Sequence, residues 1–414
     1  MMVLKLWHRG VSFVRENKDV TFSFLLYGSG LLGMLLSDLY VSSNFSTSNI
    51  AEWAFFKSTI LIVSTICLLG FDQLFVRDQT LIKRYFYSFI GYTFLIVLSV
   101  LLIIYFLKDY NLTKLILLGV AIVLMAVQNY ISAASRGNYR LWKAQFSANF
   151  WKLLLFLSIV LIPDYNTIEY FVIVLLFCVS VGFFLGGYKK VDSSFASKEI
   201  LDNKTARLMG ISFLLHNLTL VVAIYGEQFL INLFGAEMTS SHLFKYVAIF
   251  TPIALSLNGF LGFYLGPKIR IMNNMDLNGY FSFGLRILFF SIIVVMISFL
   301  FGIIYMKTIL DRSWSELDYW IIVCLFVITM IRGLYIATSV CLGVFGTKKN
   351  LQKAALYTWL TTIGYLISII IILTAYTGIL AAELICFATL INWFLRLFIS
   401  NTFTVITLKK RSIE

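Results

Sequence analysis

Charged residues are scarce in this sequence of 414 residues. Only 13% of the residues are Asp, Glu, Lys or Arg, whereas 60% are hydrophobic. Soluble domains carry roughly 25% charged residues. The shortage of charge excludes an ordinary soluble domain and predicts a polytopic membrane protein.

Sequence signatures of catalysis and metal binding are also missing. The five cysteines show no Cys-x-x-Cys spacing, and no two histidines are spaced as metal ligands. We interpret the cysteines as small buried hydrophobic residues and expect no metal site. Neither a GxxxxGK[ST] phosphate loop nor a Gly-x-Ser-x-Gly nucleophile motif occurs. The sequence therefore predicts a protein that is not an enzyme and needs no cofactor.

The charged residues up to Asp19 and the lack of a small-residue cleavage site argue against a cleavable signal peptide.

Apolar runs of about 20 residues, the length that crosses a bilayer, recur along the whole chain. Twelve such spans lie near residues 21–41, 50–71, 86–107, 115–135, 146–163, 167–187, 209–233, 243–266, 286–306, 319–345, 354–375 and 378–403. The polar segment 188–208 separates six spans from six, which predicts a linker between two lobes, residues 21–187 and 209–403. Residues 1–20 are expected to form an interfacial segment, and residues 404–414 a basic tail.

The distribution of Lys and Arg predicts the orientation. With both termini in the cytoplasm, 25 of the 33 basic residues lie in cytoplasmic segments and only five in loops on the other side. Positive charge on the cytoplasmic side is the rule for membrane proteins. The net charge of +13 then faces the anionic cytoplasmic leaflet, and nucleic acid is not needed to explain it.

Three cations remain inside the spans, where a charge costs about 2.5–3.5 kcal/mol on insertion scales. Lys57 lies seven residues after Ile50, about 10 Å below the outer boundary. Arg332 lies near the middle of the tenth span, and Arg396 lies in the last one. Cations in a membrane cavity predict an anionic ligand such as phosphate or pyrophosphate. Lys57, Arg332 and Arg396 are therefore our candidate ligand-binding residues.

Structural alternatives are open for two of these cations. Lys57 can extend its side chain to the interface or pair with Glu52. Arg332 can belong to a structural ion pair, and Glu227 of the seventh span is its candidate partner if the two spans pack together.

Acidic residues in the spans are candidates for gating or ion coupling. Glu227 lies late in the seventh span, Asp38 ends the first, and Glu383 lies in the last. An interfacial position without function is the alternative for Asp38 and Glu383. Arg77 and Arg270 follow the second and eighth spans and predict a basic cytoplasmic entrance.

Two stretches, "LLGFDQLFVRD" (68–78) and "GEQFLINLFGAEMTSSHLFKYVAIFTPIALSLNGFLGFYLGPKI" (226–269), carry a resemblance together with the span count and the short loops. The chain resembles, over nearly its whole length, the Wzx-type polysaccharide flippases of the multidrug/oligosaccharidyl-lipid/polysaccharide exporter superfamily. The resemblance implies a MATE-like all-α fold whose two lobes rock about a central cavity. It also implies movement of an undecaprenyl-pyrophosphate-linked oligosaccharide from the cytoplasmic to the periplasmic leaflet of a bacterial inner membrane. The cavity cations would hold the pyrophosphate.

The resemblance further implies partners. The lipid-linked oligosaccharide and membrane lipids would be its ligands. A polysaccharide polymerase and a chain-length regulator would be its protein partners, and nucleic acid would not bind. The chain would function as a monomer.

Three other classes remain open. A multidrug or metabolite antiporter of the same superfamily would share the fold. A polytopic polymerase or glycosyltransferase would need acids in a large outer loop, whereas the first outer loop, "SSNFSTSN" (42–49), is uncharged. A facilitator of the major facilitator type would carry a Gly-rich Asp-Arg motif that "GFDQLFVRDQTLIKR" (70–84) does not match.

Overall fold

The described part of the chain is built from helices. The computed structural model describes residues 18–75, 78–108, 110–138, 140–162, 167–185, 202–256, 269 and 275–411. No strand occurs in these ranges, and eleven of their helices are long and apolar enough to cross a membrane. Helices satisfy every backbone polar group within one segment, which a lipid environment requires. The prediction of a polytopic all-α membrane protein is confirmed.

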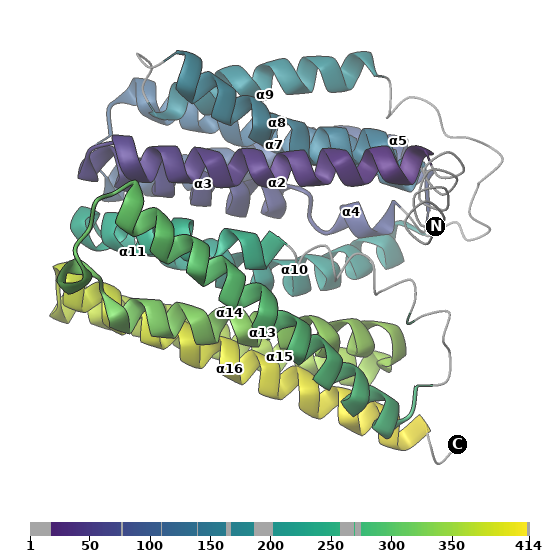
Figure 1. Cartoon of the computed structure of the whole chain (residues 1–414). Coiled ribbons are helices and arrows are strands. Elements are labelled where there is room, and N and C mark those ends of the chain that lie inside the picture. The colour runs from purple at the N-terminus through teal and green to yellow at the C-terminus, as the bar shows by residue number, and fades with distance from the viewer. Residues whose placement is uncertain are drawn as a thin grey trace, which may run out of the picture. The chain divides into compact units, whose positions relative to one another are not determined.

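The long helices account for most of the predicted spans (Figure 1). They are α2 (Lys18–Asn44), α3 (Thr47–Cys67), α6 (Phe86–Leu107), α7 (Leu112–Gly137), α8 (Leu141–Leu161), α9 (Thr167–Phe184), α10 (Asn203–Leu233), α13 (Leu277–Thr308), α14 (Tyr319–Phe345), α15 (Lys348–Ala375) and α16 (Gly378–Arg411). The shorter elements are α4 (Phe71–Leu74), α5 (Leu81–Arg84), α11 (Glu237–Phe250) and the 3-10 turn η2 (Trp314–Glu316). All five cysteines are buried free thiols, as expected.

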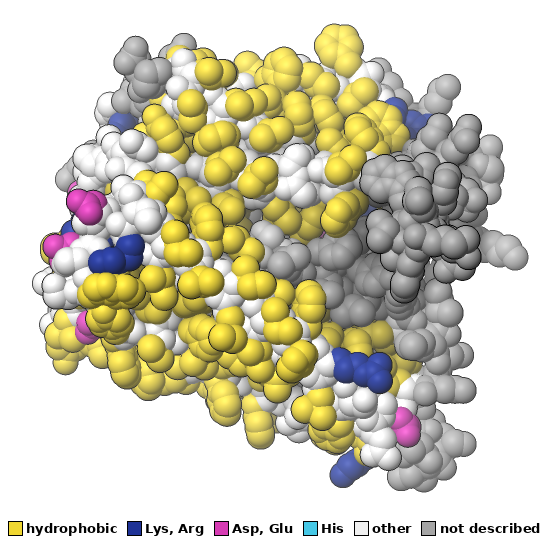
Figure 2. Space-filling view, in the orientation of Figure 1, with side chains coloured by type: hydrophobic (Ala, Val, Ile, Leu, Met, Phe, Trp, Pro, Cys, Tyr) yellow, Lys and Arg dark blue, Asp and Glu magenta, His cyan; other side chains and the backbone are white. Residues whose placement is uncertain are grey.

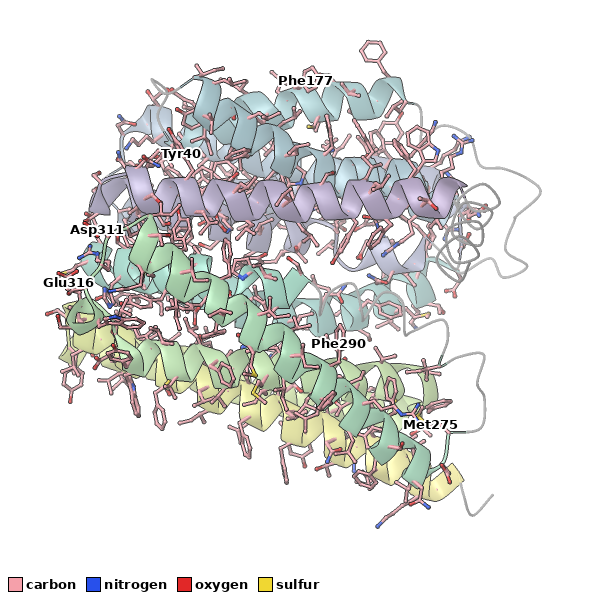
Figure 3. The ribbon with its side chains drawn as sticks, viewed as in Figure 1. Tyr40, Phe177, Met275, Phe290, Asp311 and Glu316 are labelled. Carbon is pink, nitrogen blue, oxygen red and sulfur yellow. The ribbon has the colours of Figure 1, made fainter. Side chains whose placement is uncertain are left out.

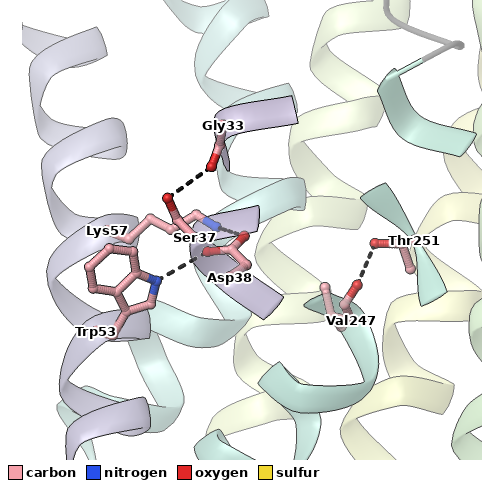
Figure 4. A network of polar contacts seen from close by, with 7 residues as sticks. All are labelled: Gly33, Ser37, Asp38, Trp53, Lys57, Val247 and Thr251. Atoms are coloured by element: carbon pink, nitrogen blue, oxygen red, sulfur yellow. Dashed lines mark hydrogen bonds and ion pairs between the residues drawn. The ribbon is translucent and has the colours of Figure 1, made fainter. Parts of the chain in front are cut away.

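The predicted eighth span, 243–266, begins within α11 but is interrupted. α11 ends at Phe250, and Pro252 follows two residues later. Proline has no N–H and crowds the carbonyl of the preceding turn, so it interrupts a helix. The Thr251 hydroxyl donates to the Val247 carbonyl at 2.8 Å beside this break (Figure 4). Residues 257–266 lie outside the described residues, so a twelfth span stays a prediction.

Several predicted segments lie wholly or partly outside the described residues. Of the N-terminal segment 1–20, only residues 18–20 are described, and they begin α2. Of the linker 188–208, residues 203–208 belong to α10. Most of the expected tail 404–414 is helical, because α16 continues to Arg411. The location of the termini stays a prediction.

The chain forms two compact units. Unit 1 comprises residues 1–37 and 59–218, and unit 2 comprises residues 38–58 and 219–414. The division passes through α2, α3 and α10, so residues 38–58 group with the second half of the chain and not with the first. The predicted lobe boundary at 188–208 falls mostly outside the described residues and stays a prediction.

Unit 1 is organised around α7, which packs against α6, α8 and α9. On the same unit, α2 approaches α8 so closely that two positions exclude a side chain. A Cβ atom at Gly33 would lie 2.4 Å from the Cα atom of Leu153, and one at Gly30 would lie 2.4 Å from the Cβ atom of Asn149. Small residues allow such backbone contact between membrane helices.

Unit 2 is organised around α16, which contacts α11, α13, α14 and α15.

The outer surface of the described helices is apolar, and Figure 2 shows hydrophobic side chains over most of one face. Phe177 of α9 and Phe290 of α13 point outward with 54% and 42% of their surface exposed (Figure 3). By contrast, Asp311 and Glu316 lie on the connection between α13 and α14. This pattern is that of helices surrounded by lipid.

The contact between α2 and α8 predicts different effects for two glycines of one helix. Gly33→Ala should lower the melting temperature in detergent, because overpacking against backbone atoms costs about 1–3 kcal/mol. Gly28→Ala is the matched control, since no atom lies within 4 Å of a Cβ built there. Thermal unfolding of the two purified variants measures this. Equal melting temperatures would contradict the described packing of α2.

Candidate ligand-binding and ion-coupling site

Asp38 and Lys57 form a buried ion pair in unit 2. Lys57 Nζ donates to Asp38 Oδ2 at 2.5 Å, and Trp53 Nε1 donates to Asp38 Oδ1 at 3.1 Å (Figure 4). Trp53 and Lys57 are four residues apart on α3, so both face the same carboxylate on α2. Only 6% of Asp38 is exposed. The attraction between the two charges offsets part of the free-energy cost of burying each of them.

Sequence reasoning considered Glu52 as the partner of Lys57 and missed Asp38. The structure brings together one predicted ligand-binding residue and one predicted gating residue. The lysine ammonium also lies 5.5 Å from the ring centroid of Phe244 on α11. In this conformation Lys57 is held by protein groups, and its role toward a ligand stays a prediction.

Glu227 lies in a buried network of hydroxyl groups. Its Oε2 accepts hydrogen bonds from the hydroxyl of Tyr365 on α15, at 2.9 Å, and from Thr389 Oγ1 on α16, at 2.7 Å. Glu227 is 7% exposed and forms no salt bridge within the described part of the chain. A buried carboxylate without a paired cation can be neutralised by a proton or a metal cation. The geometry is therefore compatible with the predicted coupling role.

Arg396 is enclosed by helices of unit 2. It is 1% exposed, and one guanidinium nitrogen donates to the Thr219 carbonyl at 3.0 Å and to Thr362 Oγ1 at 3.2 Å. Its Cζ atom also lies 5.8 Å from the ring centroid of Tyr335 and 5.4 Å from that of Trp393. Sequence reasoning placed Arg396 among the ligand-binding residues. In the described conformation Arg396 is buried and hydrogen-bonded within the protein, and its role toward a ligand stays a prediction.

Arg332 differs from Arg396 because its donors are not used. It lies at the midpoint of α14, thirteen residues from either end, or about 20 Å at helical rise. Its Cζ atom lies 4.7 Å from the ring centroid of Trp393, and the side chain is only partly buried. It makes no hydrogen bond or ion pair with any residue that the structure describes. A cation–π contact is made to the ring face and does not engage the N–H donors of a guanidinium in ordinary hydrogen bonds.

The proposed pairing of Arg332 with Glu227 takes a weaker form than a salt bridge. The two side chains interact electrostatically and belong to one cluster, but no direct contact joins them within the described residues. Arg332 is thus near a negative charge without being neutralised by hydrogen bonds. This leaves its donors available to an anion.

Sequence reasoning missed Asn392, which is a buried amide on α16. It is 2% exposed, and neither its oxygen nor its nitrogen has a hydrogen-bond partner among the described residues. Thr389, Asn392 and Arg396 are three and four residues apart, so they share one face of the helix. A buried unpaired amide costs about 1–3 kcal/mol, and such groups are rare in folded proteins. The polar spacing on the last span was the signal that could have identified it.

Glu383 lies near the other end of α16, close to a second polar group. It interacts electrostatically with Asp318 and His242. Asp318 caps α14 by accepting from the Ile321 N–H at 3.0 Å, and it also contacts His242 Nε2 at 3.0 Å. Glu383 therefore interacts with Asp318, the N-cap residue of α14, and with His242. It is not among the residues that hydrogen-bond to Glu227. Its gating role stays a prediction.

The remaining predicted positions, Arg77 and Arg270, lie outside the described residues. No cluster of three His, Cys, Asp or Glu side chains that could hold a metal ion occurs in the part of the chain that the structure describes. Comparison of the chain with protein-family models, with curated proteins and with solved structures found no match.

The ion pair of unit 2 predicts strong coupling between two substitutions. Lys57→Met should destabilise the protein by about 3–5 kcal/mol, because it leaves the Asp38 carboxylate buried and unpaired. Asp38→Asn in the same chain removes that charge and should restore most of the loss. Thermal unfolding of both single variants and the double variant measures the coupling. Additive effects would rule out the pair.

The amide of Asn392 predicts an unusual stabilising substitution. Asn392→Leu should raise the melting temperature, because it replaces two unpaired buried polar atoms by an apolar side chain of similar size. Thr389→Val is the matched comparison on the same face. It should lower the melting temperature because it removes one of the two donors to Glu227. A loss of stability in Asn392→Leu would show that the amide is satisfied in the folded protein.

Proposed function

We propose that this chain is a flippase for an undecaprenyl-pyrophosphate-linked oligosaccharide. It would work by alternating access, with twelve spans in two six-helix lobes and both termini in the cytoplasm of a bacterium. The observation that carries the proposal is Arg332, which lies at the midpoint of a membrane-spanning helix and whose guanidinium donors make no hydrogen bond with any described protein group. A charge is retained at such a depth for function more often than for stability.

Arg332 would hold the pyrophosphate. A guanidinium binds phosphate oxygens through two parallel N–H bonds, which fixes the orientation of the ligand as well as attracting it. The Trp393 ring, whose centroid lies 4.7 Å from the guanidinium carbon, would help to hold the guanidinium in position. The polyprenyl tail would remain in the bilayer, so the protein would need to shelter only the charged and sugar portions.

Lys57 would act as a second phosphate ligand only after leaving Asp38. In the absence of substrate, Asp38 would take the place of the phosphate and keep the lysine compensated. When the substrate binds, the lysine would exchange one anion for another. Such an exchange avoids an unpaired charge in either state, which is a requirement for two conformations of similar free energy.

Glu227 would couple transport to a proton or a cation. Its carboxylate interacts electrostatically with Arg332, so neutralising Glu227 would remove a negative charge close to the anion site. Anion binding at Arg332 and proton or cation binding at Glu227 would then favour each other, and this coupling is reciprocal. Partners of the chain would be membrane lipids, a polymerase and a chain-length regulator, with a monomer as the functional unit.

A multidrug antiporter is the second candidate, and one observation favours it. Glu227 is a buried carboxylate that accepts a hydrogen bond from the aromatic residue Tyr365, and aromatic rings beside an acid bind organic cations. The antiporter would export a cation that competes with protons at Glu227. The two candidates require opposite charges on the transported molecule.

Transport by reconstituted protein tests the proposal at Arg332. Arg332→Gln should lower the rate of flipping of a lipid-linked oligosaccharide in vesicles by roughly tenfold or more, equivalent to about 1.4 kcal/mol. Arg332→Lys should retain part of the rate, because it keeps the charge without the bidentate geometry. Arg312→Gln is the control, since this arginine lies on the exposed connection beside Glu316.

Two results would contradict the proposal. One is an Arg332→Gln variant that flips the lipid as fast as the parent. The other is a parent protein that exchanges organic cations for protons and moves no lipid-linked sugar, which would favour the antiporter. A deletion in the source cell gives an independent measurement. Loss of surface polysaccharide with single repeat units retained on the cytoplasmic lipid carrier is the expected result.

A further inference from the structure

Unit 1 contains a pocket that the proposed transport cycle does not use. It has a volume of about 350 Å³ and lies among α4, α5 and the first turns of α6 and α10. Its polar lining includes Arg84, Ser88, Asn203 and Arg207. No Asp or Glu is among the described residues that line it. The pocket therefore combines two fixed positive charges with neutral hydrogen-bonding groups.

The two arginines come from different elements. Arg84 ends α5, and Arg207 lies just over one turn into α10. Both line the pocket and are exposed. Two arginines in the lining of one pocket, with no acid among its described lining residues, can recognise phosphate, because the phosphate oxygens accept several N–H bonds at once.

Tyr85 supplies a second, independent sign of a ligand. It lines the pocket, is only 8% exposed, and its hydroxyl has no hydrogen-bond partner among the described residues. The hydroxyl interacts electrostatically with Arg207 and Tyr92, two other residues of the lining. Burial raises the pKa of the Tyr85 phenol well above its usual value, so the group is an O–H donor at any physiological pH. An unpaired buried donor of this kind calls for an acceptor.

The backbone around the pocket is held rigidly. A Cβ atom at Gly70 would lie 2.1 Å from the Gly210 carbonyl oxygen, so the turn before α4 packs directly on α10. The φ angle of Gly70 is +74°, in the left-handed region that favours glycine. Next to this turn, the ring of Phe71 stacks on Tyr85 with 3.5 Å between centroids. These contacts fix the position of the phenol relative to α10.

The apolar part of the lining continues onto the surface that faces lipid. Ile211 and Tyr92 line the pocket and are 51% and 41% exposed, and neighbouring Leu208 is 60% exposed. A free phosphate ion gains nothing from contact with these apolar side chains, whereas an acyl chain can pack along them. From this combination we propose that the pocket binds the phosphate of an anionic membrane lipid, with Arg84, Arg207 and Tyr85 as its ligands.

The bound lipid would act on a helix that belongs to both units. Residues 203–218 of α10 lie in unit 1, and the remainder of the helix, which carries Glu227, lies in unit 2. A lipid held at the first turns of α10 would stabilise the contact between α10 and the Gly70 turn. This inference concerns a regulatory lipid and does not depend on which molecule the protein transports.

Lipid-dependent stability of the purified full chain tests the proposal. Phosphatidylglycerol added to the protein in a neutral detergent should raise its melting temperature, and phosphatidylcholine should not. Native mass spectrometry of the same samples should show retained phosphatidylglycerol. Undecaprenyl phosphate and inorganic phosphate are the two further ligands, and they identify the source of the phosphate. Any lipid phosphate supports the site, whereas a shift by inorganic phosphate alone would overturn the lipid assignment.

Variants show whether the shift comes from this pocket. Arg84→Gln with Arg207→Gln should weaken phosphatidylglycerol binding at least tenfold, and Tyr85→Phe should weaken it several-fold. Lys204→Gln is the matched control, because it removes a positive charge from the same turns of α10 at an exposed residue outside the lining. Melting without lipid checks that each variant folds. An unchanged lipid shift in the double arginine variant, or an equal loss in Lys204→Gln, would overturn the proposal.

Discussion

The free-energy cost of holding a charge away from water governs the polar interior of unit 2. Each buried ion meets that cost in a different way. Asp38 and Lys57 neutralise each other. Glu227 relies on the hydroxyls of Tyr365 and Thr389. Arg332 lies over the face of an aromatic ring and interacts electrostatically with Glu227, but it makes no hydrogen bond with any described residue. The extent to which protein groups neutralise or hydrogen-bond each charge therefore decreases from the ion pair to Arg332. The charge that the protein compensates least is the one most able to accept a ligand.

One aromatic side chain connects the two deep arginines. The ring of Trp393 lies 4.7 Å from Arg332 and 5.4 Å from Arg396, measured from each Cζ atom to the ring centroid. The negative faces of an indole attract cations and reduce the repulsion between like charges nearby. Arg396 in turn is fixed by hydrogen bonds to α10 and α15. Packing of Arg396 thus positions the ring on which the available guanidinium rests.

Three helices are shared between the compact units. α2, α3 and α10 each contribute residues to both. The ion pair of Asp38 and Lys57 belongs to unit 2, and the Gly70–Gly210 contact belongs to unit 1. Domain movements are commonly absorbed at a few positions within or at the ends of such elements. The shared helices are therefore the segments through which a change in one unit can reach the other.

The sequence by itself determined the membrane class and most of the spans, because hydropathy is summed over some 20 consecutive residues and is a local property. It also identified Lys57, Glu227 and Arg332, since charges are rare in apolar runs. Only the tertiary structure decided their partners. Glu227 meets Tyr365 and Thr389 across sequence separations of 138 and 162 residues. Neutral Tyr, Thr and Asn residues are common in spans, so their importance depends on how each helix is rotated and against which neighbour it packs.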